Sequence, residues 1–195
     1  MIRLAVVGST RGTNLNALVA AINKQQLDAS IELVISNKKE AQILAKANDF
    51  TIKSLFVNPQ GLSREDYDKS LSAILKEHSI ELVVLIGYMR ILSAAFVKAW
   101  ENKIINIHPS LLPAFGGLMN LEVHQAVLAA GVLETGCTVH FVTEEVDNGP
   151  IILQKSCAVL ATDTPELLKE RVQQLEGKAL VEAIQKIERS LCLMH

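Results

Sequence analysis

The chain has 195 residues, of which 49% are hydrophobic, so it is long enough to bury a sizeable core in one domain. Its 19 basic and 21 acidic residues give a formal net charge of -2, which offers no electrostatic reason to bind nucleic acid or an anionic membrane. The three cysteines show no C-x-x-C spacing and indicate reduced thiols. The N-terminal apolar run lacks the features of a signal peptide, and we expect a cytoplasmic protein without a membrane span.

Strand-like and helix-like segments alternate along the first half of the chain. The expected strands are Ile2–Val7, Ile31–Ile35, Ile52–Val57, Leu82–Ile86 and Ile104–Ile107. The helices between them are indicated by Leu15, Leu18, Val19 and Ile22, by the segment Glu40–Asn48, by Tyr67, Leu71, Ile74 and Leu75, and by the segment Ser93–Trp100. This alternation predicts an α/β fold with a doubly wound, mostly parallel sheet.

The pattern changes after residue 110, where a loop leads to a C-terminal part of different character. A helix is expected near Glu122–Ala130, followed by two strands, Cys137–Thr143 and Ile151–Ala158. The polar turn between these strands ends in Gly-Pro, which favours an antiparallel, hairpin-like pair. Thr164, followed by proline and glutamate, predicts the start of a terminal helix. Its expected buried stripe is Leu168, Val172, Leu175 and Ala179.

A glycine-rich loop, Gly8–Asn14, connects the first strand to the first helix. Its two glycines and small polar residues allow backbone N–H groups to converge on an anion at a helix N-terminus. Thr10 stands where the dinucleotide fingerprint requires glycine, and the second strand ends in Ser36-Asn37 rather than in an acid, which argues against NAD. No Gly-Lys-Ser/Thr is present, which argues against an ATP-binding loop. A small phosphate monoester remains, and the alternative is an ordinary glycine-rich turn.

Two polar side chains, Asn106 and His108, lie at the end of the strand predicted at Ile104–Ile107. Residues two apart in extended chain point to the same side of a sheet. The amide can donate a hydrogen bond and the imidazole can exchange a proton near neutral pH, which indicates a site. The alternative is a satisfied polar cap. Asp147 can raise the pKa of His108 if its turn folds over the carboxyl edge of the sheet, and otherwise it caps that turn.

Two further histidines, His124 and His140, raise the question of a metal site shared with His108. Their spacings match no short zinc motif, so we expect no metal. Packing, a substrate contact or a backbone hydrogen bond is the expected role of both. His78 and His195 are expected at the surface.

Several motifs together resemble those of the glycinamide ribonucleotide formyltransferases, a folate-dependent family of the formyltransferase superfamily. The resemblance extends over essentially the whole chain and is carried by Asn106–Pro113, Gly136–Val142, Asp147–Gln154, Gly87–Leu92 and Gly12–Leu15. It implies a Rossmann-like formyltransferase fold that occupies residues 1–195 as a single domain. In that fold the parallel sheet is followed by an antiparallel strand pair and a terminal helix.

The resemblance also implies roles for particular residues. Asn106, His108 and Asp147 correspond to the catalytic trio of the family. The phosphate of the nucleotide substrate would be held by Ser9, Thr10, Arg11, Gly12, Thr13 and Asn14, and other parts of that substrate by Pro109 and Glu176. The folate would lie against Met89, Arg90, Ile91, Leu92, Val142 and Asp147.

The implied reaction transfers the formyl group of 10-formyltetrahydrofolate to the amine of 5'-phosphoribosylglycinamide in de novo purine biosynthesis. Asn106 and a protonated His108 would donate hydrogen bonds to the tetrahedral oxyanion. Asp147 would keep His108 charged and, through water, help to move a proton from the amine to the leaving nitrogen. The implied partners are these two small molecules, and no metal, nucleic acid or membrane takes part.

The chain departs from the family pattern at three places. Members usually carry a histidine soon after the glycine at 117, Gly177 follows Glu176 where histidine is common, and the chain ends soon after the last helix. One alternative is another formyltransferase or a hydrolase that uses 10-formyltetrahydrofolate, but relatives of those kinds carry extra domains or a different N-terminal loop. The other is a noncatalytic phosphate- or folate-binding module, against which the intact trio argues.

Overall fold

A computed structural model describes residues 1–192, which form one sheet of seven strands in the order β3-β2-β1-β4-β5-β6-β7. The strands are β1 (Ile2–Val7), β2 (Ala29–Ser36), β3 (Ser54–Phe56), β4 (Leu82–Leu85), β5 (Ile104–His108), β6 (Glu134–Phe141) and β7 (Ile151–Ala158). The helices are α1 (Leu15–Asn23), α2 (Gln42–Asp49), α3 (Arg64–Glu77), α4 (Ala94–Ala99), α5 (Leu121–Ala129) and α6 (Pro165–Cys192). Strands β1 to β5 pair in parallel, whereas β6 runs antiparallel to both β5 and β7. The predicted mostly parallel sheet with a C-terminal antiparallel pair is confirmed.

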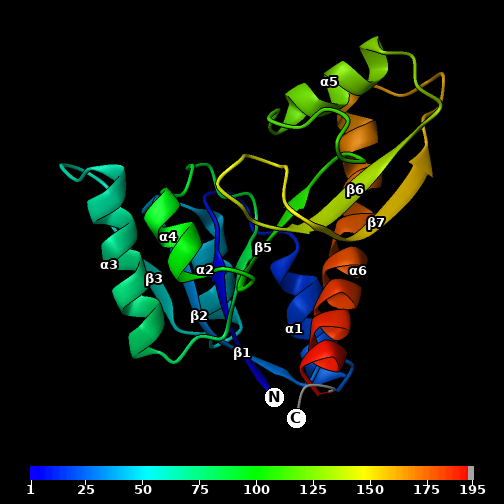
Figure 1. Ribbon diagram of the computed structural model, residues 1–195. Helices are drawn as coiled ribbons and strands as arrows, with labels where there is room; N and C mark the ends of the chain where they lie inside the picture. The colour runs from blue at the N-terminus through cyan, green and yellow to red at the C-terminus, as the bar shows by residue number, and fades with distance from the viewer. Residues whose placement is uncertain (193–195) are drawn as a thin grey trace.

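Helices cover both faces of the sheet (Figure 1). Leu4 and Val6 of β1 belong to the core on the face covered by α1, α2, α5 and α6. Ala5 and Val7 belong to the core on the opposite face, which α3 and α4 cover. Successive side chains of a strand point to opposite faces, so β1 is apolar at every one of these positions.

Some predicted boundaries differ from the structure where tertiary pairing decides them. β6 begins at Glu134 rather than at Cys137, because its first residues pair with the end of β7, from Glu134 opposite Ala158. It ends at Phe141, and the Thr143 hydroxyl donates a hydrogen bond to a carbonyl in the following turn. β3 is shorter than predicted, since this edge strand pairs only with β2.

The terminal helix α6 begins as predicted. The hydroxyl of Thr164 accepts a hydrogen bond from the N–H of Leu167 at 3.3 Å, and Pro165 is the first helical residue. Most of the predicted stripe is fully buried, and Leu175 is partly buried against the same core. α6 packs along β6, β7 and α1 (Figure 1), which places its middle turns beside the glycine-rich loop.

No helix within residues 1–192 is long and apolar enough to cross a membrane. Among the described cysteines, Cys137 is buried and Cys157 is half-buried, and both are free thiols. His78 lies at the surface, as predicted, and is half-buried because its ring contacts the carbonyl of Ile74 and the Lys53 ammonium. The predicted surface position of His195 lies outside the described residues.

Candidate active site

The loops that follow β1 and β4 meet the end of β5 at one edge of the sheet. The strand order reverses between β1 and β4, and ligands of open α/β sheets bind in the crevice at such a switch point. A cleft of about 360 Å³ opens there. Asn106 and His108, from the end of β5, both line it, as their two-residue spacing predicts.

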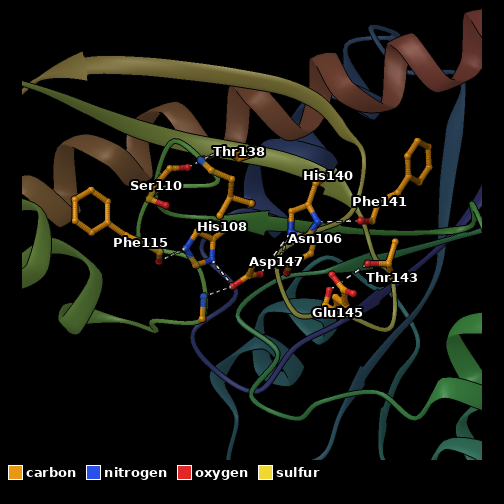
Figure 2. Close-up of polar contacts among 12 residues, drawn as sticks. Asn106, His108, Ser110, Phe115, Thr138, His140, Phe141, Thr143, Glu145 and Asp147 are labelled. Carbon is orange, nitrogen blue, oxygen red and sulfur yellow. Dashed lines mark hydrogen bonds and ion pairs between the residues drawn. The ribbon is translucent and has the colours of Figure 1, made fainter.

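The turn between β6 and β7 brings Asp147 to His108 (Figure 2). One Asp147 carboxylate oxygen, Oδ2, lies 3.2 Å from Nδ1 of His108. The same oxygen accepts a hydrogen bond from the N–H of Gly117 at 2.9 Å, and Oδ1 lies 3.6 Å from Nε2 of His140. The side chain of Asp147 is only 11% exposed. The predicted approach of Asp147 to His108 is therefore present in the structure.

The pKa of His108 reflects two opposing effects. Burial lowers the pKa of His108 below its ordinary value, and the Asp147 charge and the Phe115 carbonyl only partly oppose this. Burial raises the pKa of Asp147, but contacts from His140 and the Gly117 N–H, with the histidine charges, outweigh it, so this pKa lies below its usual range. The Asp147 charge raises the pKa of His108, as predicted for a nearby carboxylate, but desolvation of the buried ring is the larger effect, so the net shift is downward.

Both ring nitrogens of His108 nevertheless face acceptors. Nε2 donates a hydrogen bond to the carbonyl of Phe115 at 3.1 Å, and Nδ1 faces the Asp147 carboxylate. A ring in this setting makes both bonds only when it carries both protons. A proton that arrives at Nδ1 of His108 therefore meets the Asp147 carboxylate, while burial disfavours the charged ring.

His140 is a fourth polar member of this cluster. It stands opposite Asn106 in the β5–β6 register, and the Asn106 amide donates a hydrogen bond to His140 Nε2 at 3.2 Å. The other ring nitrogen donates to the carbonyl of Phe141 at 2.9 Å, the backbone hydrogen bond expected as one role for this residue. Its place beside Asn106 could have been predicted only with the register of the two strands known.

The glycine-rich loop contributes to the cleft unevenly. Thr10, Arg11, Thr13 and Asn14 line it. Ser9 does not, because its hydroxyl donates to the side-chain oxygen of Asn37 at 2.6 Å and accepts from the N–H of Met89 at 2.9 Å. Gly12 also lies away from the cleft, with a φ of 61° that favours glycine. The Ser9 hydroxyl is thus engaged inside the chain and Gly12 has no side chain, and the contact of both with a phosphate stays a prediction.

Glu176 reaches the loop from α6. Its carboxylate accepts a hydrogen bond from the Asn14 amide at 2.7 Å, and the side chain lines the cleft. Burial raises the pKa of Glu176, with Asn14 and Lys169 opposing the rise. Gly177 makes this contact possible, because a Cβ there would lie 2.7 Å from Cβ of Ala17 and would push α6 from α1. Gly177, which departs from the family pattern, thus allows α1 and α6 to pack close together.

The residues predicted to contact folate also line the cleft. These are Met89, Arg90, Ile91, Leu92 and Val142, and Pro109 lies in the lining with them. Exposed apolar side chains are found along this lining, including Ile91, Met119 and Val146. Within residues 1–192, no three histidine, cysteine or acidic side chains are grouped so as to hold a metal ion.

The sequence profile of the formyl transferase family matches residues 2–184. The chain belongs to the formyl transferase family. Phosphoribosylglycinamide formyltransferase of Bacillus subtilis (strain 168) is 38% identical over 91% of this chain and 90% of that protein. The trifunctional purine biosynthetic protein adenosine-3 of Gallus gallus is 47% identical over 95% of this chain, which spans only 18% of that protein. The crystal structure of glycinamide ribonucleotide transformylase 1 from Symbiobacterium toebii superimposes with a TM-score of 0.90 at 41% identity, covering 94% of this chain and 86% of that one.

Substitution of Gly12 by alanine should disturb the loop of this formyl transferase. The new Cβ would clash with the side chain of Ile43, at a backbone conformation that costs other residues about 1–2 kcal/mol. We expect a several-fold higher KM for the substrate that this loop is predicted to hold, and a loss of about 2 kcal/mol in unfolding free energy. Steady-state kinetics and urea unfolding measure the two effects.

Gly61→Ala is the matched control for this substitution. Gly61 also has a positive φ, of 78°, but a Cβ added there would meet no atom within 4 Å, and the residue is absent from the cleft lining. This variant should lose about 1 kcal/mol of stability and keep the KM. An equal change of KM in both variants would contradict a specific role for the loop.

Buried His124 should make the stability of this formyl transferase depend on pH. Burial, with the charges of Lys169 and His108, lowers the pKa of His124 to about 4. The pKa of a histidine in the unfolded chain is about 6.5. Between this pH and about 4, His124 therefore binds a proton in the unfolded chain but not in the folded chain. The stabilisation is complete above about pH 6.5 and is lost as the pH falls towards about 4, by about 3 kcal/mol in total.

His124→Asn should reduce this dependence. Between about pH 7 and pH 4.5, the wild type should lose about 2 kcal/mol more unfolding free energy than the variant. Urea unfolding of both proteins at the two pH values provides the measurement. Identical losses in both proteins would show that His124 titrates normally in the folded chain.

Proposed function

We propose that this formyl transferase passes the formyl group of 10-formyltetrahydrofolate to the amine of 5'-phosphoribosylglycinamide, a step of de novo purine biosynthesis. The observation that carries the proposal is the convergence of Asn106, His108 and Asp147 in one cleft that the loop after β1 also lines. The names of relatives that align over nearly their whole length support the same substrates. The single seven-stranded sheet supports one formyltransferase domain over residues 1–195. The free thiols support a cytoplasmic setting.

The chemistry begins with attack of the substrate amine on the formyl carbon that is attached to N10 of the folate. A new carbon–nitrogen bond forms, and the formyl oxygen becomes an oxyanion. The Asn106 amide retains a second N–H beyond the one that His140 accepts, and this N–H is available to the oxyanion. Stabilisation of the developing charge is the part of catalysis that we assign to Asn106.

A proton must then move from the attacking nitrogen to N10 before the bond between N10 and the formyl carbon breaks. We assign this transfer to His108 and Asp147. Because Nε2 is hydrogen-bonded to the Phe115 carbonyl, Nδ1 is the ring nitrogen that takes up the proton, and the Asp147 carboxylate at 3.2 Å stabilises the charged ring until the proton passes on to N10. The products are the formylated amine and tetrahydrofolate.

The nucleotide is assigned to the end of the cleft formed by the loop after β1 and by α6. Thr10, Arg11, Thr13 and Asn14 supply polar and charged groups there, at the N-terminus of α1, which favours a phosphate. Glu176 adds an acceptor for a hydroxyl or amine of the substrate. The folate is assigned to the lining formed by residues 87–92, where Ile91 provides an exposed apolar contact.

A steady-state assay with both substrates tests the proposal. The purified protein should release tetrahydrofolate only when 10-formyltetrahydrofolate and glycinamide ribonucleotide are both present. Release without the nucleotide would indicate a hydrolase instead. Binding of both compounds without turnover would indicate a noncatalytic module.

A further inference from the structure

The segment between β4 and α4 lines the cleft without regular secondary structure, and two side chains hold its ends. At one end, the Ser9 hydroxyl accepts the N–H of Met89 at 2.9 Å. At the other end, the Asp68 carboxylate of α3 accepts the N–H of Ser93 at 2.6 Å. Only Arg90, Ile91 and Leu92 lie between these two anchors, and all three line the cleft.

Asp68 is an unusual anchor because it is a buried acid. It is 2% exposed and neighbours Tyr67 on α3, which is fully buried. Burial of a carboxylate is costly unless hydrogen bonds compensate for the lost water, and the Ser93 N–H supplies such a bond. The other acids at the start of α3, Glu65 and Asp66, are exposed. The hydrogen bond from the segment therefore offsets part of the cost of burying the Asp68 carboxylate.

Arg90 strengthens the link between α3 and the segment. Its guanidinium carbon lies 4.5 Å from the centroid of the Tyr67 ring, a cation–π distance. Successive residues of α3 therefore hold the segment in two places, Tyr67 under Arg90 and Asp68 at Ser93. α4 begins directly after this contact, with the Ser93 hydroxyl accepting the N–H of Phe96.

The backbone between the anchors has free hydrogen-bonding groups. Within residues 1–192, the N–H and C=O groups of Arg90, Ile91 and Leu92 make no hydrogen bond inside the chain. A ligand in the cleft can pair with such groups only if the segment keeps one shape. With three residues between two fixed points, the release of either anchor frees the backbone that the ligand needs.

We infer that Asp68 is a positioning residue that holds residues 90–92 in the conformation required by the folate co-substrate, an inference that rests on the proposed function. Asp68 does not line the cleft and touches no reacting atom. Its loss should therefore weaken folate binding and leave the nucleotide, assigned to the other end of the cleft, almost unaffected.

The test compares three variants of the full chain. Asp68→Leu removes the acceptor and fills the same space, and proteins often tolerate the replacement of a buried charged side chain by an apolar one of similar volume. Asp68→Ala is the second removal variant, and Asp68→Asn keeps an oxygen that can accept the Ser93 N–H. Asp163→Ala is the control, because Asp163 also accepts a backbone N–H, that of Leu160 at 2.8 Å, but lies outside the cleft lining.

Two quantities are measured for each protein. One is the Kd of a folate analogue in which carbon replaces N10, by calorimetry, and the other is the KM for glycinamide ribonucleotide. Asp68→Leu and Asp68→Ala should raise the Kd about tenfold, equivalent to about 1.4 kcal/mol, with the nucleotide KM within about twofold. Asp68→Asn should restore the Kd to within about threefold of the wild type. Asp163→Ala should lower the melting temperature without changing the Kd.

Wild-type Kd in both removal variants would overturn the inference, and so would equal losses of folate and nucleotide affinity. Failure of Asp68→Asn to recover affinity would also contradict the hydrogen bond as the cause. A wild-type protein that neither binds the analogue nor transfers a formyl group would remove the proposed function itself. The loss of the inference alone is therefore distinguishable from the loss of both.

Discussion

Asp147→Asn should lower kcat by about 10³, within the range of about 10²–10⁴ that positioned proton transfer contributes. Asparagine has nearly the same shape and can still accept the Gly117 N–H, but it carries no charge to stabilise a proton on His108. The charged form of an already buried ring then becomes harder to reach. KM for both substrates should change little, because the substitution removes an interaction used in the transition state.

Steady-state kinetics with both substrates measures this effect. Asp163→Asn is the matched control, since it removes the same charge from an acid that pairs with Arg171 away from the cleft. The control should keep wild-type kcat. Turnover of Asp147→Asn within about threefold of the wild type would remove Asp147 from the proton path.

Asn106→Ala should lower kcat by about 10²–10³, the usual effect of removing one donor to an oxyanion. The amide is placed by β5 and oriented by its hydrogen bond to His140 at 3.2 Å. Alanine removes the donor and also leaves His140 Nε2 without it. Because the oxyanion exists only after attack, kcat should fall more than either KM rises.

Asn48→Ala provides the comparison for this substitution. Asn48 lies on α2, where its amide oxygen accepts a hydrogen bond from the Ser54 hydroxyl at 2.9 Å, away from the cleft. Its kcat should equal that of the wild type. A fall in kcat of less than about fivefold for Asn106→Ala would mean that another group stabilises the oxyanion.

The fold was largely predictable because its signals are local. Leu82 to Leu85 are buried on both faces, and a short run of apolar residues predicts such a strand directly. Thr164 and Pro165 mark the start of α6 for equally local reasons. The start of β6 at Glu134 was not predictable, because polar residues there form a strand only through pairing with β7.

In the candidate site, too, features set by local sequence were predictable and features set by tertiary structure were not. The spacing of Asn106 and His108 is a local property, and it correctly predicts that both face one cleft. The position of Asp147 depends on how a long turn folds back, so residue types alone left two roles open. The sign of the His108 pKa shift depends on burial, which the sequence does not report.

The roles of residues whose side chains bond to distant parts of the chain were the hardest to predict. Ser9 lies in a loop typical of anion binding, yet its hydroxyl contacts Asn37 and Met89, both distant in sequence. Asp68 lies in a helix rich in charged residues, where nothing separates a buried acid from an exposed one. Such contacts are set by tertiary packing and carry no local pattern.

The central claim is that the formyl group passes directly from the bound folate to the bound nucleotide. The most informative test follows a ¹³C label in the formyl group of 10-formyltetrahydrofolate by NMR. With glycinamide ribonucleotide and the wild-type protein, the label should appear in the formylglycinamide product at the rate of tetrahydrofolate release. Accumulation of the label in free formate, or no movement of the label, would contradict the account.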